Sequence, residues 1–195
     1  MIIHEEAKIH IHEYPFAEKL NPILHKIILD KADKRDRGAL MMDYKSFDVP
    51  EFKKIGNYAL SIITGCKWSW TTPVILHDGL ILANIWGQWY GKGDFQSPHT
   101  HYPFEWSFTY FVNTPRGSSP LVFTTSKKKV AAKAGSMVIF PSWVKHHVPP
   151  NKSEERSVIA GNFFYENKLE ARYDDRSTDQ LFSGTNDLEK FSDYL

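Results

Sequence analysis

The sequence predicts a mainly β protein, a sandwich or small barrel, with helices flanking it at the N-terminal end. From about residue 74 the chain consists of short runs rich in β-branched and aromatic residues, separated by Gly, Pro, Asn and Ser, which is typical of successive strands. Before that point, two segments carry apolar residues at helical spacing. With 195 residues, 42% of them hydrophobic, the chain can bury a core within one domain.

The composition argues against several classes of protein. The 24 Lys and Arg residues balance 23 Asp and Glu residues, so the basic excess of a nucleic-acid or membrane-surface binder is absent. Cys66 is the single cysteine, which excludes an intramolecular disulfide and a Cys-rich metal site. No apolar run approaches the roughly 18 residues of a membrane span, and residues 1–12 lack the pattern of a signal peptide. We therefore expect a soluble cytoplasmic protein.

The first 38 residues are expected to contain one strand and one helix. Residues 9–12 alternate apolar and polar side chains, as in a half-buried strand. A helix is predicted with Asn21 as its N-cap and Pro22 in its first turn. Its apolar stripe is Ile23, Leu24, Ile27 and Ile28. Residues 30–37 indicate a loop or a frayed helix end before Gly38.

A second helix is predicted from Asp48. Pro50 just inside its start and Glu51, three residues after Asp48, are typical of a capping box, and Gly65 suits its end. The apolar face of this helix is Phe52, Ile55, Ala59, Ile62 and Ile63.

Five strands are predicted in the rest of the chain. They are residues 80–90, 105–113, 120–125, 136–140 and 155–165. We expect a single domain over residues 1–195. In it, residues 1–73 form a helical part that packs on the barrel, residues 74–173 form the β core, and residues 174–195 form a C-terminal arm.

Three histidines suggest a metal site. On a strand, His99 and His101 would face the same side, with Cα atoms about 6.6 Å apart at ~3.3 Å per residue, so both imidazoles can bind one ion. His146, at the end of a later predicted strand, can supply a third ligand where the sheet folds back. Imidazole suits iron, zinc, copper and nickel, so these residues alone do not choose the metal.

Other histidines are given a plainer interpretation. His10 and His12 have the same spacing as the first pair but no supporting features around them, so we interpret them as surface residues. Alternation places His147 on the face opposite to His146.

Arg156 begins the last predicted strand, ten residues after His146. If these residues lie on adjacent strands, the guanidinium could point into the barrel beside the metal and hold a carboxylate with two parallel hydrogen bonds. The alternative is a surface arginine paired with Glu154 or Glu155.

Together these residues resemble the Fe(II)/2-oxoglutarate-dependent oxygenases, most of all a family common in marine bacteria and their phages. The resemblance covers about residues 86–163, and its most specific part is the block from Phe140-Pro141-Ser142-Trp143 through His146 and Val148 to Pro150-Asn151. It also includes Trp86, Gly93, Pro98-His99-Thr100-His101, Ser107, Tyr110, Val112, Glu155-Arg156 and Asn162.

The resemblance implies a double-stranded β-helix, a distorted jelly roll that holds one ferrous ion at its open end. It implies Fe(II) and 2-oxoglutarate as cofactors, dioxygen as co-substrate, and hydroxylation of a protein side chain or a small molecule. The far carboxylate of 2-oxoglutarate would pair with Arg156 and a nearby hydroxyl. Tyr90 and Tyr110 are the candidates for that hydroxyl, because Val158 stands where many relatives have a serine.

The first pair of ligands departs from the usual family pattern, which is His-x-Asp or His-x-Glu. Here the third position is His101. Either His99, His101 and His146 form a three-histidine site, or Glu105 supplies the carboxylate. Glu105 has the same parity as His101, but Tyr102-Pro103 interrupts the strand between them. We favour the three histidines.

The same residues are also similar to a cupin. The first cupin motif is matched from Gly93 to Glu105, although Val112 replaces its final glycine, and much of the second from Gly135 to His146, although Trp143 replaces a glycine. A cupin dioxygenase or isomerase would not use 2-oxoglutarate. It would bind iron, manganese or zinc through His99, His101, Glu105 and His146.

A third possibility is a β-sandwich without catalytic activity that binds a ligand or serves as a scaffold, with its tryptophans simply in the core. Metal affinity distinguishes it from the two enzymes. For an enzyme, we expect an aromatic mouth suited to a peptide side chain or a planar small molecule. Its predicted lining is Trp89, Tyr90, Trp106 and Phe108. Asn151-Lys152-Ser153 fits a glycosylation sequon, which we interpret as chance.

Overall fold

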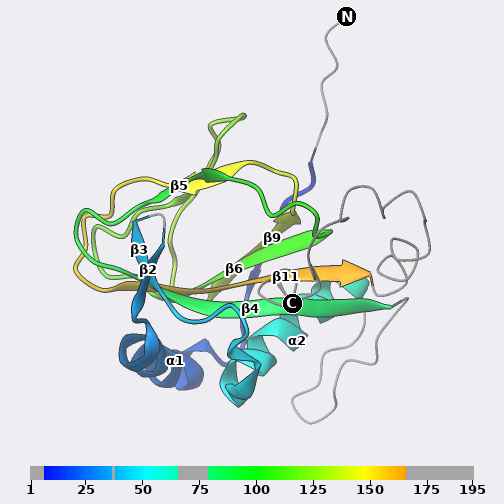
Figure 1. The fold of residues 1–195 in the computed structure, drawn as a ribbon, viewed down its shortest axis with the longest axis horizontal. Coiled ribbons are helices and arrows are strands. Elements are labelled where there is room, and N and C mark those ends of the chain that lie inside the picture. The colour runs from blue at the N-terminus through cyan, green and yellow to red at the C-terminus, as the bar shows by residue number, and fades with distance from the viewer. Residues whose placement is uncertain (1–6, 37, 66–78, 166–195) are drawn as a thin grey trace, which may run out of the picture.

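Two antiparallel sheets face each other, and two helices cover the outer face of the larger one (Figure 1). The computed structural model describes residues 7–36, 38–65 and 79–165. Cys66 and the arm expected over residues 174–195 lie outside this part of the chain. The prediction of a mainly β protein with helices near its N-terminal end is confirmed.

The larger sheet has seven strands. In spatial order they are β1 (His10–Glu13), β9 (Ser136–Pro141), β6 (Trp106–Asn113), β11 (Arg156–Tyr165), β4 (Leu80–Tyr90), β3 (Ala39–Met41) and β2 (Lys34–Asp36). The smaller sheet has four strands, which are β5 (Gln96–His99), β10 (His146–Val148), β7 (Leu121–Phe123) and β8 (Lys129–Val130). The helices are α1 (Ala17–Lys31) and α2 (Pro50–Thr64), with a 3₁₀ turn, η1 (Ser46–Asp48), before α2.

The five strands predicted from the pattern are all present, and the longest has the expected bounds, Leu80–Tyr90. The loop or frayed helix end expected over residues 30–37 is correct only for the end of the helix. Helix α1 continues to Lys31, and β2 then forms a hairpin with β3 that extends the larger sheet beside β4. The hairpin was missed because its strands have three residues each, too few to show an alternating pattern.

Helix α1 begins four residues before the predicted cap. Its N-cap is Phe16, and Asn21 and Pro22 lie inside the helix. The Asn21 side chain instead donates to the Val112 carbonyl at 2.9 Å and accepts from the Tyr110 hydroxyl at 2.6 Å, so it fastens the helix to β6. The buried stripe is Leu20, Leu24 and Ile28, while Ile23 is half exposed.

Helix α2 starts and ends close to the predicted positions. The capping box is wrong, because Val49 is the N-cap and makes no side-chain capping bond. Gly65 ends the helix with φ of 69°, a left-handed conformation that glycine adopts without a steric penalty.

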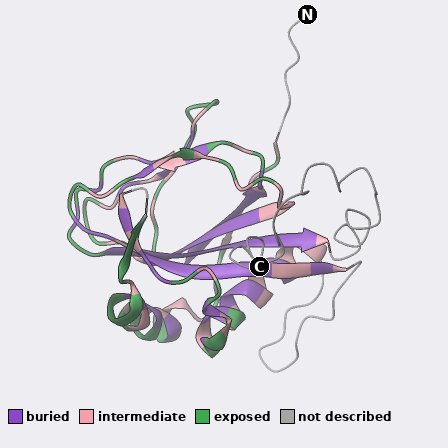
Figure 2. Ribbon diagram, viewed as in Figure 1, coloured by how far each residue is buried: buried purple, intermediate pink, exposed green. Residues whose placement is uncertain are grey.

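The core has two main parts, one on each face of the larger sheet, and the central strands β9, β6, β11 and β4 are buried along most of their length (Figure 2). The helix-facing core lies between the larger sheet and the helices and includes Leu24, Phe52, Ile85, Phe108 and Tyr110. The inter-sheet core lies inside the barrel and includes Tyr90, Phe111, Val138, Phe140 and Val158. A small third cluster joins Met41, Trp86 and Ala160. A functional side chain inside the barrel must therefore come from the inter-sheet face.

None of the helices within the described residues is long and apolar enough to cross a membrane.

Candidate active site

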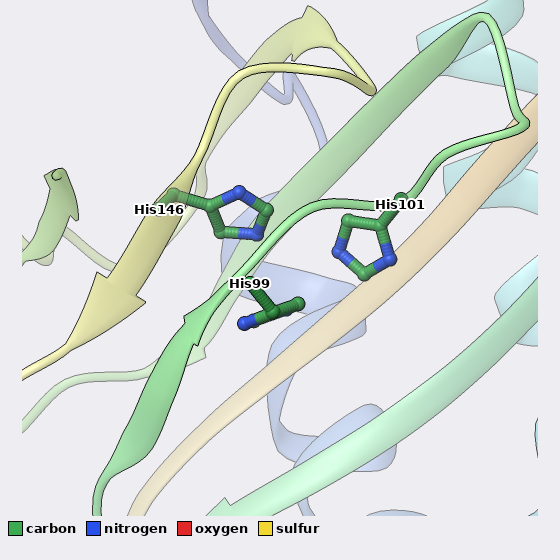
Figure 3. Close-up of side chains that lie close together, drawn as sticks. All are labelled: His99, His101 and His146. Carbon is green, nitrogen blue, oxygen red and sulfur yellow. The ribbon is translucent and has the colours of Figure 1, made fainter. Parts of the chain in front are cut away.

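The three predicted histidines lie close together, with their rings turned toward one another (Figure 3). His99, at the end of β5, and His146, at the start of β10, are register partners across the smaller sheet. His101 lies two residues beyond β5, where its backbone N–H donates to the Ser142 carbonyl at 2.8 Å. One ring nitrogen from each histidine lies within 4.8 Å of those of the other two.

Backbone carbonyls select the tautomers of two of these rings. The Nδ1 atom of His99 lies 2.7 Å from the Ser97 carbonyl, and that of His146 lies 2.9 Å from the Val144 carbonyl. Because a carbonyl only accepts, each Nδ1 carries the hydrogen and each Nε2 keeps a lone pair. This arrangement fits a divalent metal ion, since metal-binding histidines commonly donate their other N–H to a carbonyl.

Aromatic rings hold the histidines in place. The Phe140 ring lies 4.6 Å from that of His146, and the Trp86 ring lies 5.9 Å from that of His101. The centroids of the His99 and His146 rings are 4.4 Å apart. Rings packed this closely have little freedom to rotate, so the three nitrogens are preorganised to meet at one ion.

The other candidate ligands do not belong to this group. Within the described residues, the metal-capable group holds the three histidines and no carboxylate. The backbone N–H of Glu105 donates to the Phe163 carbonyl, and its carbonyl accepts from the Ser142 N–H. His147 lies next to Thr124, with 2.9 Å between Nδ1 and the hydroxyl.

Arg156 is the first residue of β11 and is fully buried. It is the register partner of Tyr90, whose ring centroid lies 4.4 Å from the centre of the guanidinium. Its Nε donates to the Ser119 carbonyl at 3.1 Å. The two terminal nitrogens, Nη1 and Nη2, have no hydrogen-bond partner within the described residues. The alternative of a surface arginine paired with a neighbouring glutamate is therefore wrong.

The electrostatics of this pocket favour an anion. Burial lowers the pKa of Arg156 from its ordinary value, and contact with Tyr90 opposes that shift. An arginine nevertheless keeps its proton at neutral pH, so a positive charge lies in an apolar environment. Burying such a charge without an anionic partner is costly. A carboxylate that accepts from Nη1 and Nη2 together would satisfy both the charge and the hydrogen bonds.

The two predicted tyrosines lie on opposite faces of the larger sheet. Tyr90 is in the inter-sheet core beside Arg156, and its hydroxyl donates to the Gln88 side chain at 3.0 Å. Burial raises the pKa of Tyr90, although the nearby guanidinium opposes the shift. Tyr110 is in the helix-facing core, bonded to Asn21, so the expectation that it holds 2-oxoglutarate does not fit its position.

The predicted aromatic mouth is also wrong. Trp89, Trp106 and Phe108 pack in or against the helix-facing core. The exposed aromatic side chains beside the histidines are instead Tyr102, 77% exposed, and Trp143, 48% exposed. Tyr102 directly follows His101, and Trp143 directly follows Ser142, whose carbonyl accepts from the His101 N–H.

Three of the residues around Arg156 were missed by the sequence argument. Ser119 provides the carbonyl that accepts from Arg156, and Gln88 and Gln96 are buried near Tyr90. A serine in the loop before β7 and two glutamines carry no motif, so no sequence signal singled them out.

The facing sheets and the histidine group define a class of fold, the double-stranded β-helix of the 2-oxoglutarate-Fe(II) oxygenases. A viral collagen prolyl hydroxylase of Paramecium bursaria Chlorella virus-1 has a TM-score of 0.64 at 13% identity, over 80% of this chain and 94% of that one. A Pseudomonas putida prolyl-4-hydroxylase has a TM-score of 0.60 at 17% identity, over 82% and 94%. An oxidoreductase of the 2-oxoglutarate-Fe(II) oxygenase family from Burkholderia pseudomallei has a TM-score of 0.59 at 11% identity, over 82% and 86%. At these identities the likeness concerns the fold.

Sequence comparison leads to more particular relatives. Two PKHD-type hydroxylases of Prochlorococcus marinus, from strains NATL2A and NATL1A, are 31% and 30% identical over 103 residues. The match covers 48% of this chain and 44% of each relative, so the chain spans less than half of their length. No protein-family model matches the chain. The predicted resemblance to 2-oxoglutarate-Fe(II) oxygenases is confirmed by both comparisons.

Proposed function

We propose that the protein is an Fe(II)- and 2-oxoglutarate-dependent dioxygenase that hydroxylates a protein side chain or a small molecule. The observation that carries the proposal is the buried guanidinium of Arg156, with two unpartnered nitrogens, in the same barrel as three convergent histidines. Neither feature alone would suffice, since many folds bind metals through histidine and buried arginines also occur in structural networks.

His99, His101 and His146 would hold the iron. Three imidazoles are neutral ligands, so the site lacks the negative charge of the more usual His, His, carboxylate set. Arg156 would hold the far carboxylate of 2-oxoglutarate through Nη1 and Nη2, with Tyr90 beside it. The bound iron and 2-oxoglutarate supply the oxidative chemistry, in which 2-oxoglutarate is decarboxylated while dioxygen is activated.

The chain's own contribution is binding, orientation and exclusion of water. One strand connects the two halves of the site, because Tyr90 contacts Arg156 while Trp86 contacts His101. Trp86 and Tyr90 are four positions apart on β4, so their Cα atoms lie about 13 Å apart at ~3.3 Å per residue. The apolar side chains of Phe111, Phe140 and Val158 line the barrel between the sheets, and a dry site strengthens the pairing of Arg156 with a carboxylate.

The substrate class follows from the relatives only as a proposal. Two of the solved relatives are named prolyl hydroxylases, and another prolyl hydroxylase was solved with a hypoxia-inducible-factor peptide fragment. We propose a peptide side chain as the first class to test, with Tyr102 and Trp143 at the rim of the site. A cytoplasmic location, as expected from the single cysteine, belongs to the same proposal.

The two alternatives receive less support. A cupin enzyme without 2-oxoglutarate gives no role to the unpartnered nitrogens of Arg156, and Glu105 lies outside the histidine group. A purely structural β-sandwich gives no reason for three rings to converge with their tautomers set by carbonyls.

The test is an anaerobic titration of the Fe(II)-loaded protein with 2-oxoglutarate, monitored by the visible charge-transfer band of the chelated cofactor. We expect a saturable band that His146→Ala abolishes and the matched variant His147→Ala retains. Bound iron without a band would favour the cupin alternative, and absence of metal binding would refute both enzymes.

A further inference from the structure

Asn151 lies in the loop before β11 and connects it to the end of β4 and to the loop before β7. It is 2% exposed, and its side-chain oxygen accepts from the Ser119 backbone N–H at 3.0 Å. Its side-chain nitrogen lies 3.1 Å from the Tyr90 carbonyl, 3.3 Å from that of Gly91 and 2.9 Å from that of Ser153. One amide therefore contacts the end of β4, the loop before β7 and the loop before β11.

The backbone of Asn151 strengthens the first of these connections. Its N–H donates to the Asp94 carbonyl at 2.7 Å, and its carbonyl accepts from the Gly93 N–H at 2.7 Å. The Ser119 hydroxyl also donates to the Pro150 carbonyl at 2.9 Å. These bonds hold the turn after β4 and the segment of Ser119 against the same short loop.

Two of the contacted residues are those that orient Arg156. Ser119 offers the carbonyl that accepts from Nε, and Tyr90 presents the ring that lies against the guanidinium. The Asn151 amide bonds the N–H of the first and lies within reach of the carbonyl of the second. The guanidinium is planar, so its bond from Nε to Ser119 and its contact with the Tyr90 ring also fix the direction of Nη1 and Nη2. That direction therefore depends on where Ser119 and Tyr90 are held.

We infer that Asn151 is a positioning residue for the far carboxylate of 2-oxoglutarate, acting through Ser119 and Tyr90 on the guanidinium of Arg156. The inference rests on the proposed function. It also gives a role to the Asn151-Lys152-Ser153 sequence, since the asparagine amide is buried in its own hydrogen bonds and not available as a glycosylation site.

The experiment compares Asn151→Ala with wild type in the Mn(II)-loaded protein. Calorimetry measures the dissociation constants of 2-oxoglutarate and of Mn(II) separately. We expect 2-oxoglutarate to bind about 10- to 100-fold more weakly, as when one partner of a buried charged hydrogen bond is misaligned, and Mn(II) affinity to change by less than about twofold. In the metal-free protein, hydrogen exchange at the Ser119 amide should accelerate.

The matched control is Asn21→Ala. Asn21 also makes two side-chain bonds, to Val112 and Tyr110, which are partly buried and lie on the helix-facing side of the larger sheet. We expect this variant to have a lower melting temperature and an unchanged 2-oxoglutarate affinity. If Asn151→Ala does not fold, Asn151→Asp replaces it, because the aspartate keeps an oxygen for the Ser119 N–H but loses the donor to Tyr90.

The outcomes separate the two proposals. If the wild-type Mn(II) protein binds no 2-oxoglutarate, the proposed function fails and this inference fails with it. If wild type binds and the Asn151 variant matches it within about twofold, only this inference fails. Equal losses of Mn(II) and 2-oxoglutarate affinity would likewise overturn it, by indicating a general structural role.

Discussion

Replacing Arg156 by methionine should separate its role in binding from its role in folding. The position is fully buried. Because arginine and methionine side chains have similar length, the substitution removes the charge while leaving little empty space. If the arginine is present to bind a carboxylate, the ligand-free protein gains little stability from it. The variant should then be folded and unable to respond to 2-oxoglutarate.

The structure gives the size of the expected stability change. Replacing a buried charge by an apolar side chain is commonly neutral or stabilising by about 1–4 kcal/mol. Against this, the variant loses the bond from Nε to Ser119, about 1.5–3 kcal/mol, and the contact with the Tyr90 ring, about 0.5–2 kcal/mol. The opposing effects nearly cancel, so we expect the free energy of unfolding to change by less than about 2 kcal/mol.

Thermal unfolding with and without 2-oxoglutarate is the assay. In the metal-loaded wild type, a ligand concentration of about 100 times the dissociation constant adds about 2.7 kcal/mol, which raises the melting temperature by roughly 5–10 °C for a chain of this size. The Arg156→Met variant should show no rise at the same concentration and an unchanged affinity for the metal.

Two results would refute this reasoning. A loss of several kcal/mol in the ligand-free variant would mean that the arginine stabilises the fold through its own contacts, as a structural residue does. A normal rise of the melting temperature with 2-oxoglutarate would remove Arg156 from the binding site, whatever the stability of the variant.

Three further predictions concern the metal and pH. His146→Ala should abolish tight Fe(II) binding while His147→Ala binds within about twofold of wild type by calorimetry; equal effects of the two would contradict the assignment. Glu105→Gln should leave iron affinity within about twofold, and a large loss would instead support a carboxylate ligand. Burial raises the pKa of Tyr90 and Tyr110, so these phenols ionise more readily in the unfolded chain. Their contribution to stability should therefore be constant below about pH 10 and fall as the pH rises above it. The fall should be less steep in Tyr110→Phe, as measured by denaturant midpoints between pH 8 and 11.

The histidine group was predictable because it depends on short-range regularities. A spacing of two residues suggested a shared side for His99 and His101, and a third histidine followed a later strand. In the folded chain only the first of the pair belongs to β5, and His101 reaches the site through its bond to Ser142. The convergence was expected, but the way in which His101 achieves it depends on a contact between loops.

Strand patterns could not show which tyrosine lies beside Arg156. Strands β4, β6 and β11 are covered on both faces, by the helices and by the smaller sheet, so both faces are apolar and no alternation separates them. The assignment of Tyr110 and the aromatic mouth failed for this one reason. In the same way, Asn21 has the features of a helix cap but is used to bond β6.

The sequence by itself determined the class of fold, five of its strands, its two helices and the three histidines, because periodicity and residue chemistry are local properties. Only the tertiary structure decided which face of a doubly covered strand points into the barrel, that residues 34–41 extend the larger sheet, and that Arg156 keeps two nitrogens without partners. These features arise where segments distant in the chain meet, and the free energy of burying or pairing a side chain there depends on neighbours that the local sequence does not contain.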